Sequence, residues 1–95
     1  MAIQGYKDKR LQAILDEGKV PKGMPADLAG VLRRKLVMLD AAKALDDLRA
    51  PSANRLEALK ADRIGQHSIR VNKQFRLCFR WREQGPVDVE FVDYH

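Results

Sequence analysis

The chain ends on three residues whose side chains can exchange protons and bind anions. They are Asp93, Tyr94 and His95, a carboxylate, a phenol and an imidazole. An imidazole gains and loses its proton near neutral pH, which suits a general acid or base. Chain ends usually fray, but alternating apolar residues at Val87, Val89 and Phe91 predict a strand that ties this tail to a sheet. We therefore interpret the tail as a candidate acid–base site.

Two cations upstream of the tail fit the same chemistry. Arg76 lies within Gln74 to Trp81, on the face opposite Phe75 and Leu77. A guanidinium is a rigid fork of donors that matches phosphate oxygens, although a solvated strand arginine is the simpler interpretation. Lys60 is a second candidate, with a plain surface charge as its alternative. The combination predicts an anionic, phosphodiester substrate.

Glu57 and Asp93 are candidate proton acceptors, with salt bridges as their alternative role. His67 shares a face with Ile69 and Val71, so we expect it to pack or to lie at an edge. Tyr94 either stacks on a base or packs at the sheet edge. The sequence holds two histidines and one cysteine and offers no recognisable metal-ligand spacing, so no metal or cofactor is expected.

The length, charge and patterning predict one small basic domain over residues 1–95. The formal net charge of +5 favours an acidic partner: nucleic acid, an acidic protein or anionic lipid. No signal peptide or membrane span is visible, so we expect a cytoplasmic protein with no membrane partner.

The elements that must position these residues follow from periodicity. Helical spacing predicts helices over Lys7 to Glu17, from Pro25 to Leu39 and over Ala41 to Leu48, with Arg33 to Lys35 mostly off the apolar stripe of the second. Strands are expected at Arg55 to Leu59, His67 to Val71, Gln74 to Trp81 and Val87 to Val92, with a tight turn at Asn72-Lys73. Helices followed by strands predict an α+β fold, with helices on one face of a curved antiparallel sheet. The other face would carry Arg76, Arg80 and Arg70.

Three stretches carry a resemblance to a known family: RLEALK, HSIRVNKQFRLCF and the terminal DYH. With the upstream segment RRKLVMLDAAKALDDLR, they cover nearly the whole chain. The sequence resembles the HigB branch of the RelE-like toxins, which belong to type II toxin–antitoxin pairs. This resemblance implies a RelE-like fold and metal-independent cleavage of messenger RNA in the ribosomal A site. It also implies a HigA-like helix-turn-helix antitoxin as partner, with operator DNA bound only through the toxin–antitoxin complex.

The resemblance extends to single residues. Lys60 and Arg76 match the basic catalytic positions of the family, and Tyr94 and His95 match its C-terminal functional pair, preceded by Asp93. Some HigB toxins have a histidine where this chain has Glu57, which can act as a base but not as a cationic stabiliser. We expect Arg76→Ala to abolish activity and to leave the fold intact.

The remaining basic residues are expected to bind ribosomal RNA, with solvated surface charge as the alternative. They are Lys7, Lys9, Arg10, Arg33, Arg34, Arg70 and Arg80. Two other functions fit the same fold, a non-catalytic blocker of the ribosome and a ParE-like poison of DNA gyrase. Lys60, Arg76, Tyr94 and His95 together favour the nuclease.

Overall fold

The structure is a computed structural model that describes residues 1–93. Its α-helices are α1 (Arg10–Glu17) and α2 (Ala29–Ala41). Its strands are β1 (Glu57–Ala58), β2 (His67–Arg70), β3 (Phe75–Arg82) and β4 (Gly85–Asp93). Short 3-10 helices complete the described chain: η1 (Ala26–Leu28), η2 (Leu45–Arg49), η3 (Ser52–Asn54) and η4 (Ala61–Arg63).

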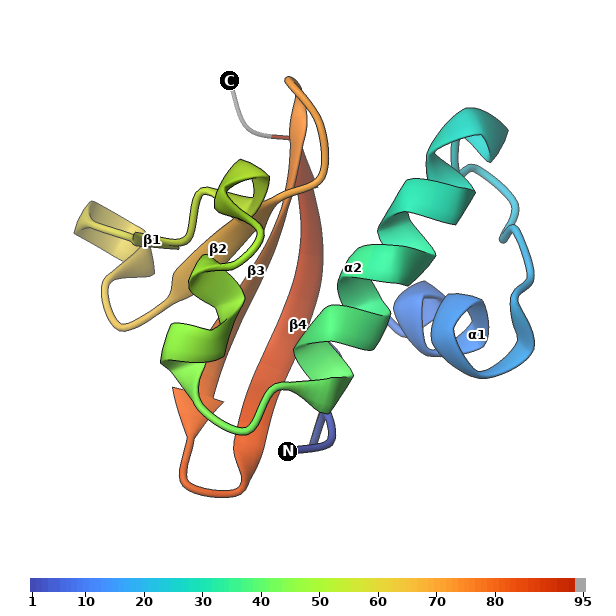
Figure 1. The fold of residues 1–95 in the computed structure, drawn as a ribbon. Helices are drawn as coiled ribbons and strands as arrows, with labels where there is room; N and C mark the ends of the chain where they lie inside the picture. Colours follow the sequence, from blue (N-terminus) through green and yellow to red (C-terminus); the bar gives the residue numbers. More distant parts are fainter. Residues whose placement is uncertain (94–95) are drawn as a thin grey trace.

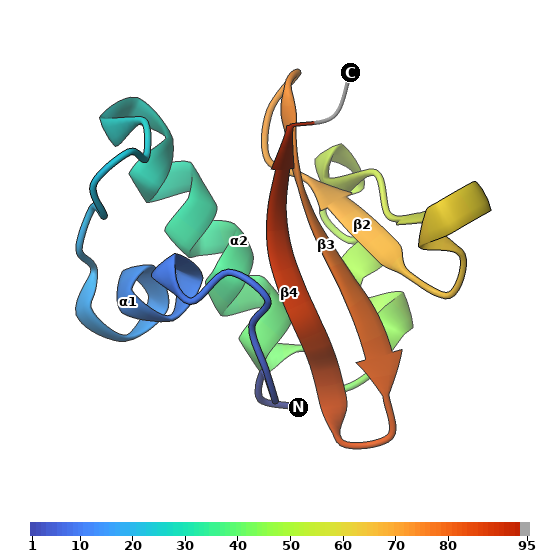
Figure 2. The same ribbon diagram turned by 180° about the vertical axis from the view of Figure 1, so that it is seen from behind.

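The four strands form one antiparallel sheet in the order β1-β2-β3-β4. Both helices lie on the same side of this sheet (Figures 1 and 2). Leu77 and Phe79 of β3, both fully buried, pack there against α2 side chains that include Leu32 and Leu36. The expected α+β fold, with helices on one face of an antiparallel sheet, is confirmed.

Helix α1 begins at Arg10, three residues later than the helical spacing predicted. The backbone N–H groups of Lys7 and Asp8 donate to the carbonyl of Val89, so this segment is bound to the edge of β4 and cannot join a helix. The carboxylate of Asp8 then accepts the N–H of Arg10 at 3.1 Å, as a residue preceding a helix commonly does. Gly18 follows the helix in the left-handed conformation, with φ 66°, which is common at helix ends, so the predicted end at Glu17 is confirmed.

The helix predicted over Ala41 to Leu48 is wrong in type and extent. Ala41 is the last residue of α2, and Ala42 is extended, with ψ 133°. A 3-10 helix follows only at Leu45–Arg49. The carboxylate of Asp47 accepts the backbone N–H groups of Lys43, at 3.0 Å, and Ala44, at 3.2 Å. A side chain that takes up these donors competes with continuous α-helix formation.

Strand β4 contains an irregularity that changes which side chains share a face. Arg80 pairs with Val87 and Cys78 with Glu90, so β4 uses one residue more than β3 over this stretch. Asp88 lies in the extra position, with φ 53°. The extra residue moves Val87 to the face opposite Val89, so the predicted common face of Val87, Val89 and Phe91 holds only for the last two.

Candidate active site

The helix-free face of the sheet carries the arginines that the strand alternation predicted there. Arg70 of β2 pairs directly with Arg76 of β3, and directly opposed residues share a face. Arg80 lies on the same face because β3 itself runs without interruption. Ser68 is in the neighbouring row, opposite Cys78 on one side and Glu57 on the other.

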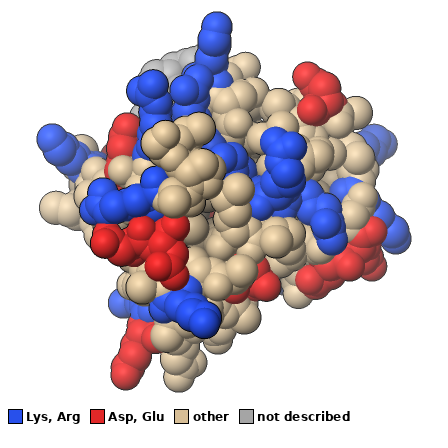
Figure 3. All heavy atoms as spheres, in the orientation of Figure 1, with Lys and Arg blue, Asp and Glu red and all other residues tan. Residues whose placement is uncertain are grey.

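A hollow of about 310 Å³ opens beside these residues. Its lining residues are Arg55, Glu57, Arg70, Asn72, Lys73 and Arg76. The described lining residues therefore comprise four cations and one carboxylate. Lys and Arg side chains gather over this part of the molecule, near the β2–β3 turn (Figure 3). Such a positive concave surface attracts and concentrates anions.

Arg76 is buried rather than solvated, with only 7% of its surface exposed. Its Nε donates to Ser68 Oγ at 2.7 Å, and its Nη2 donates to the carbonyl of Arg55 at 2.5 Å. These bonds hold the guanidinium plane in one orientation at the wall of the hollow. They also change our expectation for Arg76→Ala, because removal of a buried donor leaves its acceptors without it and costs stability as well as activity.

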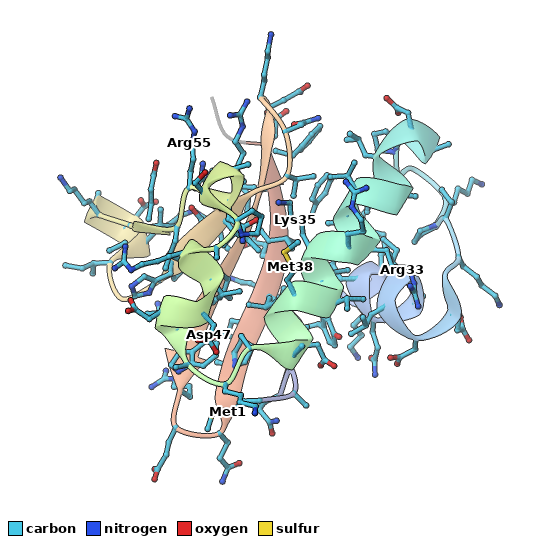
Figure 4. The ribbon with its side chains drawn as sticks, in the orientation of Figure 1. Met1, Arg33, Lys35, Met38, Asp47 and Arg55 are labelled. Atoms are coloured by element: carbon cyan, nitrogen blue, oxygen red, sulfur yellow. The ribbon has the colours of Figure 1, made fainter. Side chains whose placement is uncertain are left out.

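Arg55 holds its carbonyl toward Arg76 by adopting a left-handed backbone, with φ 45°. This conformation costs a non-glycine residue about 1–2 kcal/mol. The Arg55 N–H donates to Ser52 O at 3.1 Å, which together with the Arg76 bond fixes the turn between η3 and β1. The side chain of Arg55 is exposed and lines the hollow (Figure 4).

Asn54, next to Arg55, is fully buried and organises this turn. Its Nδ2 donates to the carbonyls of Leu48, at 3.1 Å, and Ala50, at 3.4 Å. Its Oδ1 accepts from Lys35 Nζ at 2.5 Å, and Figure 4 shows Lys35 reaching from α2 toward this segment. The expectation that Lys35 lies off the apolar stripe is therefore wrong, since it is 8% exposed. Burial, and secondarily the charge of Arg34, lowers the pKa of Lys35.

The other predicted catalytic residues are only partly brought together. Glu57 is exposed and lines the hollow, whereas Lys60 is exposed beyond β1 and is not among the described residues that line it. Asp93 ends β4, is exposed and accepts from Gln74 Nε2 at 3.1 Å. The predictions for Tyr94 and His95 lie outside the described residues.

Arg80 shares the open face but is directed to other partners. Its Nε lies 3.8 Å from Asp88 Oδ2, and its Nη1 donates to the carbonyl of Ile64 at 3.4 Å. His67 packs against Phe79, with ring centroids 6.5 Å apart, as its expected packing role requires.

The remaining predicted RNA-binding residues lie on or near the two helices. Arg10 pairs with Asp8 at 2.7 Å, and Lys9 lies beside Asp16 and Glu17 in a separate hollow. Lys7 is exposed just before α1. Arg33 and Arg34 point to different partners. Arg33 Nη2 donates to the carbonyl of Leu15 at 3.3 Å, toward α1 (Figure 4). Arg34 instead lines a hollow with Asn72 and Lys73 of the β2–β3 turn.

The described residues contain no group of three His, Cys, Asp or Glu placed to hold a metal ion. Within residues 1–93, no helix is long and apolar enough to cross a membrane.

Sequence reasoning missed Arg55, Asn72 and Lys73 as lining residues. The hairpin pattern did contain a signal for two of them, because a turn that joins Arg70 to Arg76 must place its own residues beside that pair. Nothing in the spacing identified Arg55, whose position depends on the buried contacts of Asn54.

Comparison with known proteins identifies the family of this chain. The family model described as the RelE-like toxin of type II toxin–antitoxin system HigB matches residues 4–95. Toxin HigB-1 of Vibrio cholerae is 46% identical over 81 residues, which cover 85% of this chain and 84% of that protein. Endoribonuclease HigB of Proteus vulgaris is 29% identical over 93 residues, which cover 98% of this chain and 99% of that protein. The chain therefore belongs to the HigB family of RelE-like toxins of type II toxin–antitoxin systems.

Proposed function

We propose that this toxin is an endoribonuclease that cuts messenger RNA in the ribosomal A site and so inhibits translation. One observation carries the proposal: among the described residues, Arg55, Arg70, Lys73 and Arg76 line one hollow together with the carboxylate of Glu57. The cations match the negative charge of a phosphodiester, and the carboxylate supplies one proton acceptor. The name of the Proteus vulgaris relative, an endoribonuclease, supports the same chemistry.

The reaction is attack of an RNA 2′-hydroxyl on its own 3′ phosphate. The new bond forms between that oxygen and phosphorus, and the bond to the 5′ oxygen of the next nucleotide breaks. The products carry a 2′,3′-cyclic phosphate and a 5′-hydroxyl. Since the RNA supplies its own nucleophile, no activated serine or cysteine is required, and the family resemblance implies that no metal is needed.

Each predicted residue has one role in this scheme. Arg76, held by Ser68 and the Arg55 carbonyl, stabilises the charge that develops on the phosphoryl oxygens. Glu57 takes the proton of the 2′-hydroxyl, with Asp93 as the alternative base. The other roles are assigned by resemblance: Lys60 adds positive charge, Tyr94 positions the nucleotide and His95 protonates the leaving oxygen.

Two kinds of partner follow from the proposal. Membership in a type II family implies an antitoxin, which we propose is HigA-like, with a helix-turn-helix that links the complex to operator DNA. The ribosome presents the messenger RNA, and the dispersed cations, including Lys7 and Arg33, contact ribosomal RNA with salt-sensitive affinity.

The experiment that tests this function maps RNA 5′ ends in a purified translation reaction, with and without ribosomes. We expect cuts within codons that require ribosomes and disappear when the cleaved nucleotide carries a 2′-deoxyribose. Glu57→Gln and Arg76→Lys should each lower the rate, the latter by about 10²–10³, because lysine is a point charge without the guanidinium fork. Arg49→Ala, which removes an exposed cation paired with Asp46, is the matched control.

The outcomes separate the alternative functions. Intact messages with arrested synthesis would establish a ribosome blocker, and intact messages with continuing synthesis would point to another target, such as gyrase. Urea denaturation of each variant shows whether a lost activity reflects a lost fold. A folded Arg76→Lys protein that cuts at the parent rate would remove Arg76 from the mechanism.

A further inference from the structure

We propose that a second hollow, between α2, η3 and the β2–β3 turn, binds the neighbouring phosphodiester of the same RNA strand. This inference rests on the proposed function, since it extends the path of the RNA beyond the cleaved phosphate. The hollow has a volume of about 390 Å³. Its lining residues are Val31, Arg34, Lys35, Ala53, Arg70, Val71, Asn72 and Lys73.

The two hollows are neighbours that share a wall. Arg70, Asn72 and Lys73 line both of them. Arg70 Nε donates to the carbonyl of Asn72 at 3.1 Å, which ties the arginine to the turn. A strand with one phosphate beside Arg76 therefore meets a second cationic hollow across this turn, so one RNA chain can occupy both.

The chemistry of the second hollow suits a nucleotide. Among residues 1–93, its lining contains the cations Arg34, Lys35, Arg70 and Lys73 and no carboxylate, so no described lining residue neutralises their charge. Val31 and other apolar side chains of the lining offer contact to a ribose or base. The charge of the lining differs from that of the hollow beside α1, where Lys9 lies with the carboxylates of Asp16 and Glu17.

Lys35 is the feature that most directly indicates an anion. An ammonium carries three donors, and in the described part of the chain Lys35 Nζ donates to one acceptor, the neutral amide oxygen of Asn54. Burial of a cation without a counter-charge is unfavourable. That cost is visible in the pKa of Lys35, which burial lowers and which nearby Arg34 lowers further. A phosphate in this hollow would supply the missing negative charge.

The test compares oligonucleotides that carry one or two internal phosphates. All-2′-deoxy dinucleotides and trinucleotides of the same bases cannot be cleaved and need no ribosome. The variants are Arg34→Ala and Lys35→Met, with Arg49→Ala and Lys43→Met as controls, because Arg49 and Lys43 are exposed and line neither hollow. Binding is followed by NMR titration at several salt concentrations.

We expect the parent to bind the trinucleotide more tightly than the dinucleotide. Arg34→Ala should weaken trinucleotide binding about tenfold, as expected for loss of one hydrogen bond to a charged group, and leave dinucleotide binding unchanged. The slope of log affinity against log salt should fall by about 0.7, the value for one phosphate contact on a single strand. The pKa of Lys35 should rise when the trinucleotide binds.

Two results would overturn the second site. One is equal affinity of the parent for dinucleotide and trinucleotide, and the other is equal trinucleotide binding by Arg34→Ala and Arg49→Ala. If Lys35→Met fails to fold, Arg34→Ala still tests the second site, because Arg34 is exposed and its substitution should leave the fold intact. If the second site failed these tests but the protein still cut messages on the ribosome, only the second site would be rejected. If the second site bound the trinucleotide but no cleavage occurred, only the proposed nuclease activity would be rejected.

Discussion

Ser68 should control both the stability of the protein and the orientation of its key arginine. Its Oγ accepts from Arg76 Nε at 2.7 Å, and both residues are buried, with exposures of 0% and 7%. A hydrogen bond to a charged group contributes about 1.5–3 kcal/mol. The backbone acceptors at Arg55 and Ser68 survive in Ser68→Ala, so we expect a loss near the lower end of this range.

The size of the effect makes it easy to measure. A loss of about 1.5 kcal/mol lowers Tm by roughly 6–12 °C in a domain of this size. It also lowers the ratio of correctly oriented to misoriented guanidinium by about tenfold, because 1.4 kcal/mol corresponds to a factor of ten in an equilibrium constant. RNA cleavage on the ribosome should therefore fall, by a factor of at most about ten, at a temperature where the variant is folded.

The assay pairs thermal unfolding with 5′-end mapping of cleaved messages. Ser52→Ala is the control, because Ser52 is an exposed serine in η3, and its substitution should change stability by less than about 0.5 kcal/mol. If Ser68→Ala kept the Tm and cleavage rate of the parent, the reasoning that Ser68 positions Arg76 would be refuted. A lower Tm with unchanged cleavage would reduce Ser68 to a structural role.

Two further predictions concern titration and reactivity. The hydrogen bond from Arg10 lowers the pKa of Asp8, so its stabilising contribution is present above the unfolded pKa of about 4 and is lost as pH falls through the folded value. An NMR titration should show this depression and its disappearance in Arg10→Gln; an unchanged titration in that variant would contradict it. Burial raises the pKa of the Cys78 thiol, which is fully buried, so iodoacetamide should modify it only at the rate of unfolding. Rapid alkylation of the folded protein would show that the thiol is accessible.

Local patterns in the sequence were sufficient to predict those features that depend on a single helix or strand. The alternation of Phe75 and Leu77 with Arg76 assigned β3 and both of its faces, since the two-residue period is a property of the strand itself. The apolar stripe of α2 was equally plain, because helical spacing is also local. The order of helices and strands then led to the α+β fold.

The sequence by itself thus determined the approximate places of α1, α2 and the four strands, the faces of β3 and the presence of Arg70 and Arg76 on the open face. Only the tertiary structure decided that Arg76 is buried, that Arg55 and Lys73 join it, and that Lys35 turns inward to Asn54. The physical reason is that each of these positions depends on groups distant in the chain: Arg76 on the carbonyl of Arg55, and Lys35 on the amide of Asn54. Periodicity describes one element at a time and contains no information on such partners.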